Sequence, residues 1–310
     1  MSNGKRVNGG AVTQATAMAL RRNGSGNGSG KTSRKPKLGQ HFLSDPRAAL
    51  RIVEALGDIS QAIVVEIGPG GGALTDLLAE RAGHLIAIEL DRVLAAQLRL
   101  RYSRFPNVEI LEGDFLKLEF PTVLGHRPGL LTDRSPHTHL STARVVGNIP
   151  YYITSDILLR LFEFHDRVDT VVIMLQKEVA DRVVARPGGR EYGLLSATSQ
   201  LYAGVEKLFT LSPAAFSPPP KVHSVVLRLV MAPQFQALGV EEEGFIDFLK
   251  LSFGKKRKTL ANNLKERYAG EAIRAALKQA GARSDVRAEA LSLGKMAALY
   301  RALAAPVAAG

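Results

Sequence analysis

Four consecutive residues, Asn148-Ile149-Pro150-Tyr151, combine a primary amide, a rigid turn and an aromatic ring. They follow the apolar segment Val145-Val146-Gly147, which is typical of the end of a buried strand. An amide beside an aromatic ring can hold a flat base and hydrogen-bond its exocyclic amine. Because Asn-x-Pro turns and capping tyrosines are also common without such a role, the tetrapeptide alone leaves both interpretations open.

A glycine-rich turn, Gly68-Pro69-Gly70-Gly71-Gly72, follows an apolar stretch over residues 62–67. Glycines between a strand and a helix let the backbone approach a ligand closely. The turn, with Glu89 placed 21 residues beyond Gly68, also satisfies a relaxed dinucleotide fingerprint. The turn alone therefore allows an NAD-dependent oxidoreductase as well as other nucleoside-binding enzymes.

Three acidic residues, Glu66, Glu89 and Asp114, lie at the ends of three successive apolar stretches. A carboxylate at position 66 would repel a pyrophosphate and attract a cationic amino acid or a sulfonium. Glu89 is placed to accept from two ribose hydroxyls, and Asp114 from an adenine amine. Because the carboxyl ends of parallel strands meet at one edge of a sheet, the three acids are expected to line one crevice. Together they favour a nucleoside cofactor without a pyrophosphate, although each acid alone would more often be a helix cap or a solvated strand end.

Strands and helices alternate along residues 38–235, which predicts an α/β domain with a mostly parallel sheet covered on both faces. From residue 241 the apolar spacing is helical only, so residues 236–310 are expected to form a small all-helical domain. Residues 121–142 interrupt the alternation with Pro, Gly, His and Ser, and are expected to form a surface insertion. Strands are expected at 62–67, 85–88, 108–111, 144–146, 171–174 and 222–230, and helices at 46–56, 73–81, 91–102 and 155–164.

The bulk composition, 45% hydrophobic and 23% charged over 310 residues, is that of a globular protein. The chain has no cysteine, which excludes disulfides, thiolate metal sites and cysteine nucleophiles. Its seven histidines are scattered, so no metal site is expected. The sequence has no apolar run long enough to span a bilayer. We therefore expect a cytoplasmic protein without a membrane partner.

Basic residues are concentrated in two segments of the chain. Residues 1–37 carry eight of the net twelve positive charges and no acid, and they include a Gly/Ser-rich repeat, so a disordered basic tail is expected. An organelle transit peptide is the second interpretation of this tail. The run Lys255-Lys256-Arg257-Lys258 lies early in the predicted helical domain. A dense run of this kind favours contact with the phosphates of a nucleic acid over a merely solvated surface.

Several segments share both residue types and order with one known group of enzymes. They resemble S-adenosylmethionine-dependent Rossmann-like methyltransferases, and more narrowly the rRNA adenine N6-dimethyltransferase family, above all its bacterial small-subunit members. The resemblance covers about residues 37–305. The segments that carry it are Gly39-Gln-His-Phe-Leu43, Glu66-Ile-Gly-Pro-Gly70, Ile88-Glu-Leu-Asp91, Gly113-Asp114, Asn148-Ile-Pro-Tyr151, Leu175-Gln-Lys-Glu-Val-Ala180, Tyr192-Gly-Leu-Leu-Ser196, Phe216-Ser-Pro-Pro-Pro-Lys-Val-His-Ser224, Lys256-Arg-Lys-Thr-Leu260 and Arg287-Ala-Glu-Ala-Leu-Ser292.

The resemblance implies a role for each matching residue. An N-terminal segment closes over the cofactor, the glycine turn backs its methionine portion, and the acids at 89 and 114 bind its ribose and adenine. The chain departs from the family pattern at two positions, with His at 41, where some relatives have Asn, and Ile at 149, where Leu is frequent. The residues implied to bind S-adenosyl-L-methionine are Gln40, His41, Leu43, Gly68, Gly70, Glu89, Asp114 and Asn148.

The implied catalytic residues are Asn148, Pro150, Tyr151 and Phe216. Asn148 accepts from the target amine, and the two aromatic rings sandwich the target base. The implied substrate is a pair of adjacent adenosines in the 3′-terminal stem-loop of small-subunit rRNA within a pre-ribosomal particle, and the enzyme is expected to be a monomer. RNA contact is expected from Lys255, Lys256, Arg257 and Lys258. The alternatives are a large-subunit rRNA methylase of the antibiotic-resistance type and a non-catalytic RNA-binding assembly factor.

Overall fold

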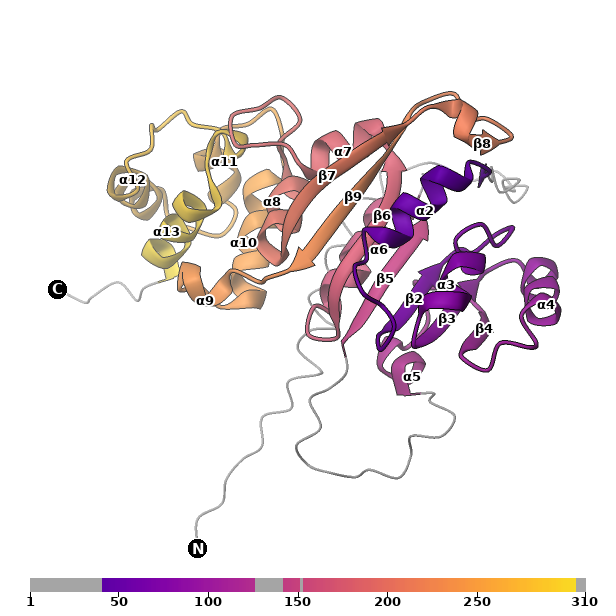
Figure 1. The fold of residues 1–310 in the computed structure, drawn as a ribbon. Helices are drawn as coiled ribbons and strands as arrows, with labels where there is room; N and C mark the ends of the chain where they lie inside the picture. Colours follow the sequence, from indigo (N-terminus) through magenta and orange to yellow (C-terminus); the bar gives the residue numbers. More distant parts are fainter. Residues whose placement is uncertain (1–40, 126–141, 151–152, 305–310) are drawn as a thin grey trace, which may run out of the picture. The chain divides into compact units, whose positions relative to one another are not determined.

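The computed structural model describes residues 41–125, 142–150 and 153–304 (Figure 1). Two residues of the predicted site, Gln40 and Tyr151, lie outside this range, as do the basic tail and most of the predicted insertion. The described residues form two compact units. The sheet unit comprises the described residues up to Ala180 together with Ala203–Met231. The helical unit comprises Asp181–Tyr202 and the described residues from Ala232 onward.

A seven-stranded sheet forms the centre of the sheet unit within the described residues. Its spatial order is β4-β3-β2-β5-β6-β9-β7. The first five strands in this order are parallel, β9 is antiparallel to β6, and β7 is antiparallel to β9. This confirms the predicted α/β class with a mostly parallel sheet. The strands are β2 (Ile63–Ile67), β3 (His84–Glu89), β4 (Val108–Glu112), β5 (Ala143–Asn148), β6 (Val168–Gln176), β7 (Ala203–Leu211) and β9 (Ser224–Met231).

The strand order reverses at β2, because the chain first adds β3 and β4 on one side and then places β5 on the other. Ile67 at the end of β2 pairs in register with Gly147, one residue before the end of β5. The glycine turn that follows β2 therefore starts beside Asn148, the last residue of β5. Open α/β sheets bind ligands at this kind of reversal, outside the carboxyl ends of the strands.

Helices bury both faces of the sheet. Apolar residues of α2 (Pro46–Glu54) and α3 (Thr75–Arg81) pack with Val146, Val172 and other strand residues in one core cluster. The residues that alternate with these, Val145 and Val171, are also fully buried, so the second face is covered as well. The remaining helices of this unit are α4 (Arg92–Arg101), α5 (Phe120–Gly125) and α6 (Thr154–Glu163), and α7 (Lys177–Val183) runs from this unit into the next.

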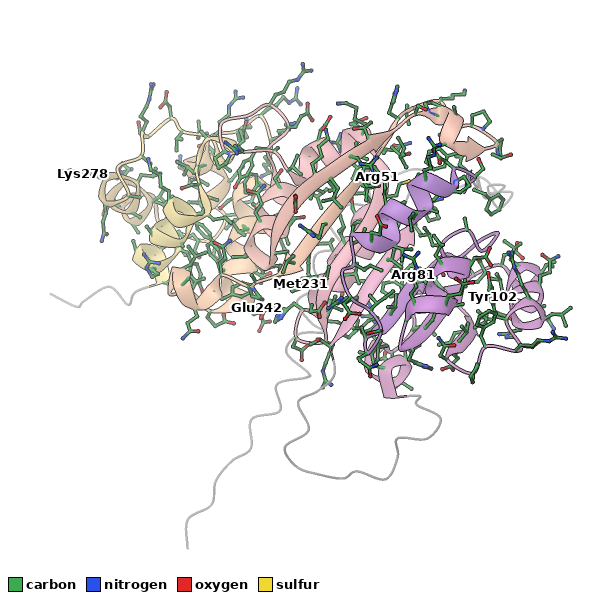
Figure 2. All side chains as sticks on the ribbon, in the orientation of Figure 1. Arg51, Arg81, Tyr102, Met231, Glu242 and Lys278 are labelled. Carbon is green, nitrogen blue, oxygen red and sulfur yellow. The ribbon has the colours of Figure 1, made fainter. Side chains whose placement is uncertain are left out.

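Two helices of the sheet unit begin where the sequence predicts. Asp45 caps α2 by accepting from the backbone N–H groups of Arg47 and Ala48. Asp91 caps α4 in the same way. Tyr102, labelled in Figure 2, lies at the other end of α4. Its hydroxyl donates to Asp76 of α3 at 2.7 Å, which ties the two helices together.

A short strand pair joins two segments that are distant in sequence. β1 (Phe42–Leu43) pairs antiparallel with β8 (Phe216–Ser217). The segment around residue 41 is thereby tied to the loop that contains Phe216. Sequence patterning does not predict this pair, because two-residue strands have no periodicity to detect.

The described part of the helical unit contains helices and no strand, as predicted from residue 241 onward. Its core includes Phe245 and Phe248, whose rings stack at 6.3 Å, and Tyr300, which packs against both. The unit also includes residues 181–202, which sequence analysis assigned to the first domain. Its elements are α8 (Leu194–Tyr202), α9 (Phe235–Leu238), α10 (Glu242–Phe253), α11 (Leu260–Leu264), α12 (Gly270–Gln279), the 3₁₀ turn η3 (Ala288–Ala290) and α13 (Leu293–Ala304).

Candidate active site

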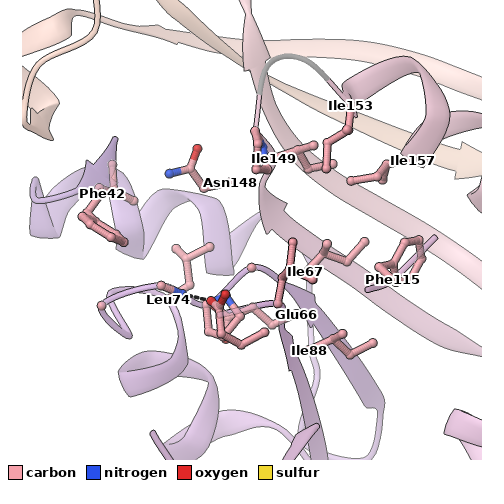
Figure 3. A pocket seen from close by; sticks show the side chains of 18 of the residues that line it. Phe42, Glu66, Ile67, Leu74, Ile88, Phe115, Asn148, Ile149, Ile153 and Ile157 are labelled. Carbon is pink, nitrogen blue, oxygen red and sulfur yellow. Dashed lines mark hydrogen bonds between the residues drawn. The ribbon is translucent and has the colours of Figure 1, made fainter. Parts of the chain in front are cut away.

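A cavity opens at the carboxyl ends of β2, β3, β4 and β5, entirely within the sheet unit (Figure 3). Most of the described residues that sequence analysis assigned to the cofactor lie in its wall. Several apolar wall residues were not predicted, because isolated apolar positions look the same in a sequence whether they contact a ligand or the core. The predicted residues in the wall are His41, Leu43, Gly68, Gly70, Glu89, Asp114, Asn148 and Pro150, and the apolar additions include Phe42, Leu74, Ile88, Phe115, Ile153 and Ile157.

The glycine turn has a backbone conformation that residues with a side chain rarely adopt. Gly68 and Gly70 have φ angles of +69° and +55°. A Cβ atom built on Gly70 would lie 2.8 Å from two ring carbons of Phe42. The turn therefore needs glycine both for its backbone conformation and for the close approach of the Phe42 ring.

Glu89 is held by the turn that it faces. Its Oε2 accepts from the Gly70 backbone N–H at 3.0 Å, and its Oε1 accepts from the Asp91 N–H at 2.8 Å. The residue is 4% exposed. Each carboxylate oxygen has further lone pairs, so Glu89 can still accept from two neighbouring hydroxyls. The carboxylate thus fixes the glycine turn and presents two acceptors at a defined position.

Glu66 is the most buried of the three acids, at 1% exposed. Its Oε2 accepts from the Thr75 hydroxyl at 2.7 Å. Burial, reinforced by the negative charges of Glu89 and Asp76, raises the pKa of Glu66 to about 8 although the Thr75 hydrogen bond opposes the shift. In the protein without ligand, Glu66 is therefore mostly protonated at neutral pH, and a cation bound beside it would favour the carboxylate that sequence analysis assumed.

This raised pKa has a measurable effect on stability. The unfolded chain ionises Glu66 near 4.5, whereas the folded protein keeps the proton until about pH 8. Between these values the folded state binds more protons, so this group lowers the free energy of unfolding as pH rises, by at most about 1.4 kcal/mol per pH unit. Glu66→Gln removes the titration. We expect urea unfolding to show a flatter decline between pH 5 and 8 for the variant than for the unmodified protein, and parallel curves would contradict the assigned pKa.

Asp114 follows β4 in the loop where the third acid was predicted. Its Oδ1 accepts from the Leu116 backbone N–H at 3.1 Å, and its Oδ2 lies 3.5 Å from Lys117 Nζ. The side chain is 30% exposed. Unlike the two buried acids, Asp114 reaches solvent and can exchange water for a ligand amine.

The Asn148 side chain is oriented by a backbone group of a distant segment. Its Nδ2 donates to the His41 carbonyl oxygen at 2.8 Å. The amide is planar, so this bond fixes which end carries the oxygen and leaves Oδ1 as an acceptor without a donor among the described residues. Figure 3 shows Asn148 beside Ile149 in the wall of the cavity, with Phe42 on the facing segment. His41, predicted to close over the cofactor, thus also positions the predicted catalytic amide.

The other predicted catalytic residues have different environments. Pro150 lines the cavity, and its carbonyl accepts from the Ile153 N–H at the start of the next helical turn. Phe216 is 3% exposed and packs with Leu43 in the core cluster, and it is absent from the described lining of the cavity. Its role as a wall for the target base stays a prediction, and that role requires the ring to be uncovered when a base enters.

The comparison with protein families identifies the class of protein to which the chain belongs. The model described as "Ribosomal RNA adenine dimethylase" matches residues 31–305. The chain belongs to this family. The match spans both described units, which confirms the family resemblance identified from the sequence motifs.

Curated members of the family are similar over most of their length. "Ribosomal RNA small subunit methyltransferase A" of Koribacter versatilis is 64% identical over 273 residues, covering 88% of this chain and 95% of that protein. The protein of the same name from Acidobacterium capsulatum is 51% identical over 270 residues, covering 87% and 91%.

Solved structures of related enzymes share the fold. The 23S rRNA methyltransferase ErmE is 27% identical, with a TM-score of 0.62 over 84% of this chain and 99% of that chain. A dimethyladenosine transferase from Plasmodium falciparum is 25% identical, with a TM-score of 0.67 over 84% and 96%. The fold of this family member is therefore that of a Rossmann-like methyltransferase.

The cofactor of this methyltransferase is S-adenosyl-L-methionine, and the residues of the cavity fit it. The glycine turn offers a close backbone surface that a Cβ would fill, and Glu89 presents two acceptors of the kind that a ribose diol needs. Gly68, Gly70, Glu89 and Asp114 would hold the cofactor. Within the described residues, no group of His, Asp or Glu side chains is arranged to bind a metal ion.

The basic run lies in the connection between α10 and α11. Lys255, Lys256, Arg257 and Lys258 are all exposed, and Thr259 next to them caps α11. Lys255 pairs with Glu266.

No helix among the described residues is both long and apolar enough to cross a membrane.

Proposed function

We propose that this protein transfers two methyl groups to the N6 amine of each of two adjacent adenosines in the 3′-terminal stem-loop of small-subunit rRNA. We further propose that it acts as a monomer in the cytoplasm, on a pre-ribosomal particle. The names of the similar curated proteins support the small-subunit substrate. The observation that carries the chemistry is the Asn148 amide, which is oriented by the His41 carbonyl so that its oxygen is left to accept.

The target amine is a weak nucleophile, because its lone pair is delocalised into the adenine ring. S-adenosylmethionine supplies an electrophilic methyl group when it is bound. Asn148 Oδ1 and the Ile149 carbonyl can accept the two N–H groups of the amine, which favours a pyramidal nitrogen with a localised lone pair. No strong base is needed, and positioning with fixed dipoles provides most of the acceleration.

The base must leave its stack before it can reach this amide. Tyr151 and Phe216 are proposed to hold it, and stacking on an aromatic ring contributes about 1–3 kcal/mol per base. Ile149, the second residue of the tetrapeptide, is fully buried, so its backbone is held in place while the base binds.

The substrate is tested by mapping methylated adenosines. Small-subunit particles and large-subunit rRNA that lack the modification are each incubated with the enzyme and labelled S-adenosylmethionine. We expect dimethylation of two adjacent adenosines near the 3′ end of the small-subunit rRNA. Labelling of large-subunit rRNA alone would support the alternative suggested by the fold similarity to ErmE, and binding without labelling would support an assembly factor.

A further inference from the structure

A second cavity lies entirely within the helical unit and has no part in the proposed reaction. Its wall is formed by the turn that leads into α8, the end of α10 and Asn263 on α11. The cavity encloses about 320 Å³. This volume is within the range of small-ligand sites, ~300–1,000 Å³, so a nucleobase can enter.

Tyr192 lines this cavity and brings to it a hydroxyl that has no partner among the described residues. The residue is 2% exposed, and its ring lies 6.1 Å from that of Phe253 at 64°. In the described part of the chain nothing hydrogen-bonds the Tyr192 hydroxyl, although buried tyrosine hydroxyls usually have a partner. Burial raises the pKa of Tyr192 to about 12, so the phenol keeps its proton and can donate at neutral pH.

Two more polar atoms of wall residues have no partner within the described residues, Asn263 Oδ1 and Ser252 Oγ. Asn263 Nδ2 donates to the Ser252 carbonyl at 2.6 Å and to the Lys255 carbonyl at 3.4 Å, which leaves Oδ1 as an acceptor. Both atoms are shielded from solvent, so a ligand reaches them only if these side chains move. A phenol donor beside amide and hydroxyl acceptors matches the mixed edge of a nucleobase.

The charges around this cavity favour a polynucleotide over a free nucleotide. Lys256 lines the cavity, is exposed and forms no ion pair with any described residue. The basic run continues past the cavity residues with Arg257 and Lys258, so successive phosphates of one backbone have cations to contact.

The acids in the wall have cationic neighbours of their own. Glu191 lies 3.8 Å from Arg182, and Glu289 lies 3.9 Å from Arg287. These ion pairs offset the negative charge of the wall. An anionic ligand therefore meets a net positive surface at Lys256.

We propose that this cavity receives one unstacked nucleotide of the RNA substrate, with its base against Phe253 and at the Tyr192 hydroxyl, and its phosphate at Lys256. The proposal rests on the proposed function, since it takes the partner to be the same RNA. A captured nucleotide that undergoes no reaction would fix the register of the RNA on the helical unit.

The decisive variant is Tyr192→Phe in the full chain, which removes one hydroxyl and keeps the ring. We expect its Kd for the small-subunit particle to rise about 5- to 20-fold, with the affinity for S-adenosylmethionine and kcat at saturating RNA within 2-fold of the unmodified enzyme. The salt dependence of RNA binding should not change, because no charge is lost. The melting temperature should not fall, since the hydroxyl has no partner to lose.

Two lysine variants distinguish a phosphate contact at the cavity from a general effect of positive charge on RNA binding. Lys256→Gln should weaken RNA binding and reduce the slope of log Kd against log salt by about 0.7–0.9, the value for one phosphate contact. Lys278→Gln, the matched control, removes an equal charge from an exposed position on α12 (Figure 2) and should leave both unchanged. Ultraviolet crosslinking of bound RNA should yield adducts on Tyr192 or Phe253.

Three outcomes would overturn the proposal. One is RNA affinity within 2-fold for Tyr192→Phe, and another is crosslinks confined to the exposed basic run. The third is micromolar binding of free AMP or GMP that requires Tyr192 and is not displaced by RNA, which would make this a small-molecule site. Binding and crosslinking need no turnover, so a failure of rRNA methylation would count against the proposed function and leave this test intact.

Discussion

Asn148→Ala is expected to reduce methyl transfer by about 10³-fold, or ~4 kcal/mol of transition-state stabilisation, in a protein that still binds its cofactor. The alanine lacks the oxygen that we propose accepts from the target amine, so the nitrogen would keep its planar, delocalised geometry. The side chain touches the backbone at His41 through one hydrogen bond, so the loss of folding stability should be small, about 1 kcal/mol. Single-turnover kinetics at saturating RNA, with calorimetry for S-adenosylmethionine, separate the two effects.

A second substitution at the same position tests how the amide is oriented. Asn148→Asp keeps an acceptor oxygen but places its other oxygen against the His41 carbonyl, where two acceptors repel. We expect a rate between those of the unmodified enzyme and the alanine variant. Equal rates for the aspartate variant and the unmodified enzyme would show that the His41 contact has no part in catalysis, and normal turnover by the alanine variant would remove Asn148 from the mechanism.

Glu89→Ala is expected to weaken cofactor binding by about 100-fold and to lower the free energy of unfolding by about 2–3 kcal/mol. The first effect follows from the loss of the two charge-assisted hydrogen bonds that Glu89 is proposed to make to the ribose. The second follows from the backbone N–H groups of Gly70 and Asp91, which lose their acceptor. Calorimetric titration and urea unfolding measure the two effects independently.

Glu80→Ala is the matched control, because Glu80 is an exposed carboxylate on α3 outside the cavity. It should change neither quantity appreciably. A Glu89→Ala variant that unfolds more easily yet binds S-adenosylmethionine normally would limit Glu89 to supporting the turn.

The positions of the strand-end residues could be predicted because a parallel sheet brings them together whatever the details of packing. Glu66, Glu89 and Asp114 follow from apolar stretches that each end in an acid, and all three lie in the wall of one cavity. The start of α2 at Pro46 was predictable for a similar reason, since Asp45 before it is a residue type that caps helices through local hydrogen bonds.

Other features depend on contacts that leave little trace in the sequence. β7 is an edge strand whose outward residues, such as Glu206 and Lys207, are charged and exposed, so it lacks the apolar run of a buried strand. The bond from Asn148 to His41 uses a carbonyl that every residue has, and no residue type marks it. The burial of Phe216 likewise depends on β1 packing beside it, which two residues of sequence cannot reveal.

The pairing of β1 with β8 has a consequence for the timing of the two methyl transfers. Dimethylation of one amine uses two cofactor molecules, so the spent one must leave between the transfers. Phe42 and Leu43 of β1 line the cavity wall, and the carbonyl that orients Asn148 belongs to the residue just before them. If β1 separates to let the spent cofactor out, the same movement releases the Asn148 amide. Cofactor exchange would then break and re-form the hydrogen bond that orients Asn148. Each transfer would begin only after β1 had paired with β8 again.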